Sequence, residues 1–237
     1  MDSPGLMDSL GNLVYGLSIW IVPLLLAITL HEAAHGYAAL KLGDDTAQRL
    51  GRISINPLRH IDPVGTVAMP LILLALSGGS FMFGYAKPVP VAFHRLRNPR
   101  IDMVKVAAAG PACNLLQAWV AALLLHAAGG PLTTALDAWL VDVLQMAVYF
   151  NVLLAVFNML PLPPLDGGRV AVGLLPNSLA APLARLDRHG FAIVLALFFV
   201  LPWLGAQLGR NWSIFQTVIL PVTRWFRQLI LLLAGHF

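Results

Sequence analysis

Residues 11–42 read GNLVYGLSIWIVPLLLAITLHEAAHGYAALKL, with no charged side chain in the first twenty positions. A helix that crosses a lipid bilayer needs about 20 predominantly apolar residues, and this stretch supplies them. The whole chain shares this character, since 58% of its 237 residues are hydrophobic, 11% are charged, and the mean hydropathy is +0.77. Ordinary soluble domains carry about 25% charged residues. The composition therefore predicts a membrane protein rather than a soluble one.

Further apolar segments alternate with polar loops along the chain. We predict membrane segments at 64–77, 103–128, 136–160, 191–208 and 212–233. Segment 64–77 is short, and is either a tilted span or a re-entrant piece. Segment 212–233 carries two arginines, and is either a span or an interfacial amphipathic helix. The expected fold is an all-α multi-pass membrane protein with four to six membrane helices.

The polar loops add two predictions about local structure. Residues 51–55 alternate polar and apolar side chains, which predicts a small β-strand near the cytosolic face. Pro88 and Pro90 exclude a helix and suit an extended edge over 81–91, with which an unwound peptide could pair. We expect one membrane-embedded domain over 1–237, composed of a core at 11–170 and C-terminal accessory helices at 171–237.

The basic residues indicate how the chain lies in the membrane. The net charge is +4, and the basic side chains lie mainly in loops between apolar segments. The positive-inside rule places loops 43–63, 79–102 and 161–190 in the cytosol of a cell-membrane protein. The charge therefore reflects topology, with the lipid bilayer and not nucleic acid as the partner. On this topology His31 and Glu32 lie roughly 15 Å into the membrane from the cytosolic side.

The segment His31-Glu32-Ala33-Ala34-His35 predicts a zinc site. Histidines four residues apart lie on one face of a helix, so that both imidazoles can bind one ion while Glu32 lies beside it. A hydrogen-bonded core histidine is the alternative for either residue. Titratable groups deep in an apolar helix are costly, with a carboxylate at about 2.5–3.5 kcal/mol, and by default indicate a functional site.

A catalytic zinc site commonly has three protein ligands and an open position, so one ligand is missing from this segment. Asp166 is the best candidate, because it lies just beyond the cytosolic end of segment 136–160. Prolines at 161, 163 and 164 stop the helix, and Gly167 and Gly168 allow a sharp bend afterwards. A cap of the following helix is the alternative role of Asp166.

At this point the sequence resembles the site-2 protease family of intramembrane metalloproteases. The family pattern, HExxH followed by NxxPxPxxDG, matches residues 31–35 and 158–167 without departure, and residues 84–91 and 110–114 are also similar to family motifs. The resemblance implies one catalytic zinc ion bound by His31, His35 and Asp166, with Glu32 as the base. It further implies cleavage of peptide bonds within or near transmembrane segments of membrane-anchored proteins.

Two amides in apolar segments are further candidates, because an unpaired buried amide is costly. Asn158 is predicted to contact substrate, whereas Asn114 serves either in substrate binding or in joining helices, as Asn151 does. Two other functions remain open at this stage, a membrane metal transporter and a catalytically inactive membrane scaffold. The oligomeric state cannot be read from the sequence.

Overall fold

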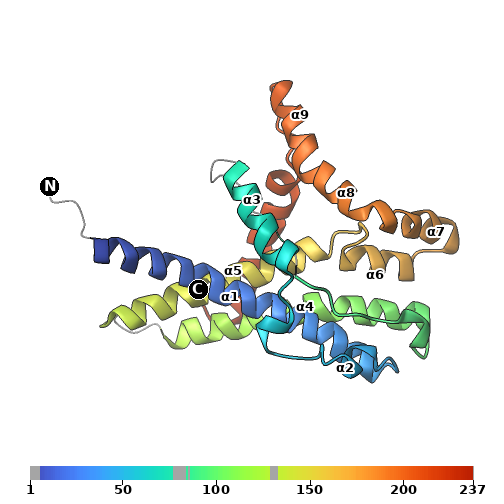
Figure 1. Ribbon diagram of the computed structural model, residues 1–237, viewed down its shortest axis with the longest axis horizontal. Coiled ribbons are helices and arrows are strands. Elements are labelled where there is room, and N and C mark those ends of the chain that lie inside the picture. The colour runs from blue at the N-terminus through green and yellow to red at the C-terminus, as the bar shows by residue number, and fades with distance from the viewer. Residues whose placement is uncertain (1–5, 77–83, 85, 129–132, 237) are drawn as a thin grey trace.

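The computed structural model describes residues 6–76, 84, 86–128 and 133–236, and these residues are predominantly helical (Figure 1). The α-helices are α1 (Leu6–Lys41), α2 (Thr46–Arg49), α3 (Met69–Leu76), α4 (Pro99–Ala127), α5 (Ala135–Asn158), α6 (Asp166–Leu174), α7 (Asn177–Arg185), α8 (Gly190–Leu195), α9 (Leu201–Gln207) and α10 (Leu220–Leu233). Short helical turns η1 (Pro57–Arg59), η2 (Pro63–Ala68), η3 (Phe93–Arg95), η4 (Asp187–His189), η5 (Ala196–Val200) and η6 (Phe215–Ile219) join them.

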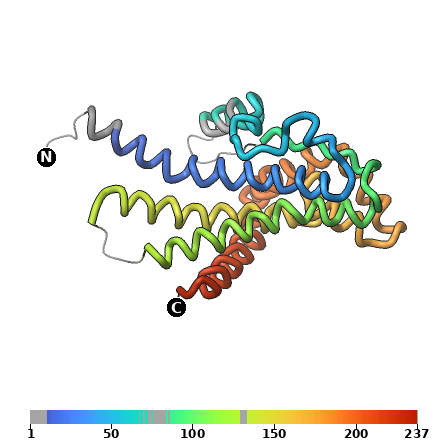
Figure 2. The backbone as a smooth tube through the Cα atoms, turned by 90° about the horizontal axis from the view of Figure 1, so that it is seen from below, coloured from blue at the N-terminus to red at the C-terminus, as the bar shows by residue number. Residues whose placement is uncertain are grey.

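Helices α1, α4 and α5 run side by side and form the centre of the molecule (Figures 1 and 2). Helix α4 begins with a proline, whose missing N–H costs nothing in the first turn of a helix. Helix α5 begins with a capping box formed by Thr134 and Asp137. Small residues let α4 approach α5 closely, since Ala118 and Ala122 pack against Val148 and Val152 in one buried cluster.

Within the described residues, four helical segments are long and apolar enough to cross a membrane, namely 11–41, 99–127, 135–158 and 177–207. This number lies at the lower end of the predicted range of four to six. Residues 63–76 are helical through η2 and α3, but they are not among these four, and neither are η6 and α10. Helix α10 instead packs obliquely across α4 and α5 (Figure 2).

The predicted β-strand is not confirmed, because the described residues contain no strand. Residues 52–55 form an irregular loop that follows Gly51, the last residue of the turn after α2, whose φ of +61° lies in the left-handed region. Side chains hold this loop by donating to backbone carbonyls, as the Arg59 guanidinium does to the carbonyl of Gly51. Five residues with alternating polar and apolar side chains do not form a β-strand when no partner strand pairs with them. Of the predicted extended edge, 84 and 86–91 are described and non-helical, and the rest lies outside the described residues.

The turn between α5 and α6 positions the start of α6 against the end of α5. Gly167 and Gly168 pack directly onto this turn, because a Cβ at Gly167 would lie 2.3 Å from the carbonyl carbon of Met159. A Cβ at Gly168 would lie 2.3 Å from the nitrogen of Pro163. The two glycines therefore let α6 dock tightly, with Asp166 as its first residue.

Candidate metal centre

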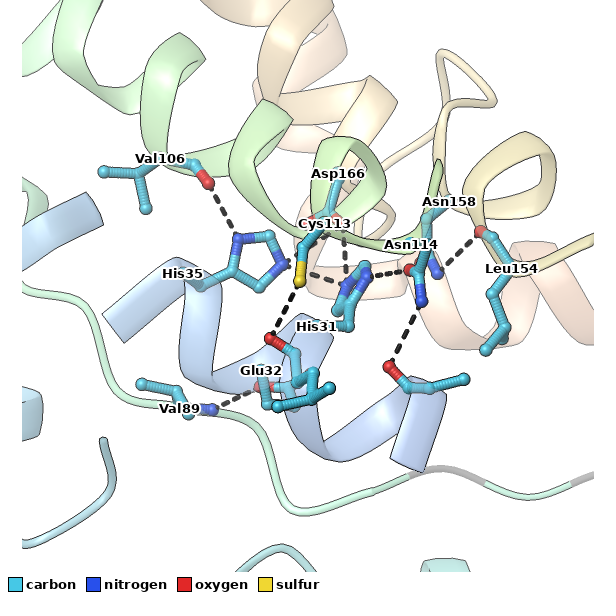
Figure 3. Close-up of polar contacts among 12 residues, drawn as sticks. His31, Glu32, His35, Val89, Val106, Cys113, Asn114, Leu154, Asn158 and Asp166 are labelled. Atoms are coloured by element: carbon cyan, nitrogen blue, oxygen red, sulfur yellow. Dashed lines mark hydrogen bonds and ion pairs between the residues drawn. The ribbon is translucent and has the colours of Figure 1, made fainter. Parts of the chain in front are cut away.

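Three titratable side chains from α1 and α6 meet inside the protein (Figure 3). The Nε2 atoms of His31 and His35 lie 3.0 Å apart, and Oδ2 of Asp166 lies 3.2 Å and 3.3 Å from them, respectively. All three residues are buried, with exposed fractions of 5–8%. The proline-ended turn thus brings Asp166 to the two imidazoles, as the sequence predicts.

The outer nitrogens of the two imidazoles determine what the inner nitrogens can do. Nδ1 of His35 lies 2.7 Å from the carbonyl oxygen of Val106, which can only accept a hydrogen bond. Nδ1 of His31 lies 2.6 Å from Oδ1 of Asn114, whose amide nitrogen already donates elsewhere. These acceptors place the proton of each neutral imidazole on Nδ1, and in that tautomer both Nε2 atoms are acceptors.

Two lone pairs and a carboxylate oxygen thus converge on one point, and this arrangement fits a cation. Oδ2 of Asp166 is buried and has no hydrogen-bond donor in the part of the chain that the structure describes, which is costly unless a positive charge lies there. Zinc bonds of about 2.0–2.1 Å at tetrahedral angles separate ligand atoms by about 3.3 Å, close to the distances between these three atoms. The nitrogen and oxygen donors are also those that zinc takes.

Helix α4 forms the wall of this site through Gly110. A Cβ at this position would lie 2.4 Å from Nε2 of His35 and 2.6 Å from Cε1 of His31. Only a residue without a side chain therefore leaves room for both imidazoles beside the α4 backbone. The sequence contains this glycine in a family motif, but which residues it faces depends on the register between α1 and α4.

Glu32 lies beside the site and is half-buried. Its Oε2 accepts a hydrogen bond of 2.7 Å from the backbone N–H of Val89 (Figure 3). No local sequence pattern predicts this contact, because the loop lies more than fifty residues beyond Glu32 in the chain.

The asparagines occupy different settings. Asn114 is fully buried and bonds three groups inside the protein, namely His31, the carbonyl of Ala27 at 3.1 Å and Oδ1 of Asn151 at 2.7 Å. These bonds favour the helix-joining alternative for Asn114. Asn158 donates to the carbonyl of Leu154 in its own helix at 3.1 Å, so its predicted contact with substrate stays a prediction.

Comparison with known proteins assigns the chain to a family. Residues 19–201 match the model of peptidase family M50. The chain belongs to this family, the site-2 proteases. "Putative zinc metalloprotease YwhC" of Bacillus subtilis is 36% identical over 223 residues, which cover 89% of this chain and 98% of that relative. "Putative zinc metalloprotease Rip2" of Mycolicibacterium smegmatis is 31% identical over 174 residues, which cover 73% and 63% of the two chains. No solved structure matches significantly.

Family and relatives agree with the chemistry of the site. The M50 match covers all three converging side chains and Glu32. The chain is therefore a multi-pass membrane metalloprotease, with a group of two histidines and one aspartate that fits zinc.

Proposed function

We propose that this chain is an intramembrane zinc endopeptidase that hydrolyses peptide bonds within or near transmembrane segments of membrane-anchored proteins. In this proposal His31, His35 and Asp166 bind one catalytic zinc ion, and the active site faces the cytosolic side of the cell membrane. The observation that carries the proposal is the convergence of three buried acceptor atoms that lie 3.0–3.3 Å from one another. The carboxylate of Glu32 follows directly after His31 in the chain.

The residues of the chain divide the work of hydrolysis. When bound, zinc acts as a Lewis acid that acidifies water and polarises the scissile carbonyl. Glu32 takes a proton from the attacking water as the carbon–oxygen bond forms, and returns it to the leaving amine as the carbon–nitrogen bond then breaks. Asn114 and the carbonyl of Val106 hold the imidazoles in the tautomer that leaves Nε2 for the metal. Burial of the three ligands keeps bulk water away from them.

A metal transporter and an inactive scaffold are the rival functions. A transporter is expected to have further ligand groups along a path, yet His31, His35 and Asp166 form the single metal-binding group found among the described residues. An inactive scaffold does not require a carboxylate such as that of Glu32, which a hydrogen bond holds next to the buried histidines and Asp166.

The first prediction tests the proposal with Glu32→Gln. This amide cannot accept the proton, so cleavage of a transmembrane substrate is expected to fall by about a hundredfold to ten-thousandfold. The three metal-binding side chains are unchanged, and zinc content measured by mass spectrometry should stay near one ion per chain. Full cleavage by the purified Glu32→Gln protein would refute the proposed mechanism, and loss of zinc would assign Glu32 to the metal site instead.

A further inference from the structure

The Glu32 carboxylate is held by a loop that follows it far along the chain. The donor is the N–H of Val89, which reaches Oε2 of Glu32 at 2.7 Å. Pro88 and Pro90 flank Val89 and have no N–H of their own, so Val89 carries the one backbone donor of this tripeptide. That donor is used on Glu32, and Val89 is buried with an exposed fraction of 8%.

Segment 87–89 is itself held by a second loop, through Arg52. The guanidinium of Arg52 donates from Nη2 to the carbonyl of Lys87 at 2.6 Å and to that of Pro88 at 3.4 Å, and from Nη1 to the carbonyl of Arg59. The N–H of Lys87 donates to the carbonyl of His60 at 2.9 Å. The segment that carries the Val89 donor is thus tied to loop 52–60 at consecutive residues.

Both loops reach α1 one helical turn after Glu32, at Gly36. A Cβ at Gly36 would lie 3.0 Å from Cγ1 of Ile53 and 3.1 Å from Cγ1 of Val89. The close approach of the two side chains to the helix fixes the distance between segment 87–89 and α1. The backbone N–H of Val89 therefore has a fixed position relative to the Glu32 carboxylate.

We propose that Arg52 and Val89 are positioning residues for the hydrolysis. Arg52 fixes segment 87–89, and the Val89 N–H holds Oε2 of Glu32, which orients Oε1 for proton transfer. The inference rests on the proposed function, since it requires Glu32 to be the proton acceptor. A hydrogen bond to an ionised group is strong and directional, and it restricts the rotamers of a flexible glutamate. Small displacements of a catalytic group lower the rate of the chemical step, so loss of this positioning should lower kcat.

The test compares Arg52→Gln and Val89→Pro in the full-length purified protein with a transmembrane substrate. Arg52→Gln loosens the segment, and Val89→Pro removes the donor. The expected result is a fall in kcat of roughly tenfold or more, the loss that corresponds to one charge-assisted hydrogen bond. KM and zinc content should remain near the values of the unchanged protein, and Arg52→Lys should restore part of kcat.

The matched control is Arg49→Gln. Arg49 ends α2, just before the same loop, and its exposed guanidinium pairs with Asp45 at 2.6 Å rather than with segment 87–89. Its kcat should equal that of the unchanged protein. If Val89→Pro does not accumulate as folded protein, Arg52→Gln carries the test.

A double-mutant cycle distinguishes positioning from general stability. Glu32→Asp shortens the side chain by one methylene, so that its carboxylate no longer reaches the Val89 N–H. Arg52→Gln should then lower kcat much less in the Glu32→Asp protein than in the unchanged protein. Equal losses in the two backgrounds would show that Arg52 acts independently of Glu32 and would overturn the inference.

The remaining outcomes are equally decisive. A rise in KM at constant kcat would make segment 87–89 a substrate-binding element, and zinc loss in proportion to activity would make Arg52 structural. Either result overturns the inference. Cleavage by Glu32→Gln at the normal rate would instead overturn the proposed function. An inactive Glu32→Gln protein together with fully active Arg52→Gln and Val89→Pro proteins would overturn the positioning role alone.

Discussion

The side-chain amide of Asn114 in α4 links the His31 imidazole to α1 and α5. Its Oδ1 accepts a hydrogen bond from Nδ1 of His31, and its nitrogen donates to the carbonyl of Ala27 in α1 and to Oδ1 of Asn151 in α5. A single side chain of α4 thus sets both the tautomer and the ring orientation of a proposed metal ligand. Groups that hold metal-binding histidines in this way contribute to metal affinity without touching the ion.

The second prediction concerns Asn114→Ala. Without the Oδ1 acceptor, the His31 ring can rotate and change tautomer, and zinc affinity should fall by about 10- to 100-fold. Competition with a fluorescent chelator measures this change. The control is Asn158→Ala, which removes an amide bonded within its own helix and should leave zinc affinity unaltered. Unchanged affinity in Asn114→Ala would show that packing alone orients His31.

At the scale of the element, α6 is anchored at both ends. Its first residue is Asp166, and its last turn is held by Arg100 of α4, whose guanidinium donates to the carbonyls of Gly173 and Leu175 and to Oδ1 of Asn177. A Cβ at Gly173 would lie 2.2 Å from Cγ2 of Val104, so the two helices also pack closely there. Arg100 therefore secures the helix that presents Asp166.

The third prediction follows from this anchor. Arg100→Ala leaves the last carbonyls of α6 without these donors, so that the C-terminal end of α6 should open more easily by about 1 kcal/mol. Hydrogen exchange should become faster at 173–177, and zinc affinity should decrease. Arg185→Ala removes an exposed positive charge nearby in the chain and should change neither quantity. Equal exchange rates in the two variants would contradict the role of Arg100.

A buried carboxylate joins the end of α1 to the loop before α4. Asp44 is fully buried and accepts hydrogen bonds from the N–H and hydroxyl of Thr46 and from the N–H of Ala92, with Arg95 nearby. Burial raises the pKa of Asp44, but these hydrogen bonds and the Arg95 charge outweigh it and hold the pKa below the ordinary value of 3.8. This carboxylate stabilises the fold as long as it is ionised.

The fourth prediction is the pH dependence of that stabilisation. A group whose pKa is lower in the folded protein contributes fully above its unfolded pKa, and the contribution is lost as the pH falls through the folded value. The melting temperature should therefore decline below about pH 3.8 as Asp44 is protonated. Asp44→Asn should be less stable at neutral pH and should show a smaller decline. An identical decline in both proteins would exclude Asp44 as the source.

The elements show which features a sequence can predict. The spacing of the histidines in α1 and the proline-ended turn before Asp166 are local patterns, and the structure brings these three groups together. The contacts of Gly110, Asn114 and Val89 depend on how α4 and a distant loop register against α1, which hydrophobic periodicity does not specify. The strand prediction at 51–55 was wrong because side chain–backbone hydrogen bonds, rather than a partner strand, hold that loop.

At the scale of the whole molecule, the surface is that of a protein covered by lipid. Large apolar side chains are exposed on several helices, including Leu13, Trp20, Leu71, Trp203 and Leu208 with exposed fractions of 51–64%. Soluble proteins rarely expose contiguous apolar surface on this scale, whereas a bilayer covers it. The four long apolar helices and the exposed side chains agree on this point.

The fifth prediction tests the orientation of the molecule. In a Cys113→Ser background, cysteines at Thr133 and Arg49 mark the two ends of the bundle, and both positions are exposed. A membrane-impermeant maleimide added to intact cells should label Thr133→Cys, while Arg49→Cys should react only after lysis. The reverse pattern would place the proposed active site toward the outer face.

The origin of the three converging side chains has a consequence for biosynthesis. The histidines belong to α1, whereas Asp166 is synthesised only after α5 is complete. A nascent chain that has already entered the membrane therefore has two of the three proposed metal ligands and lacks the third. Under the proposed function, premature termination before α6 leaves a helical bundle without a complete metal site, so unfinished chains are expected to be inactive.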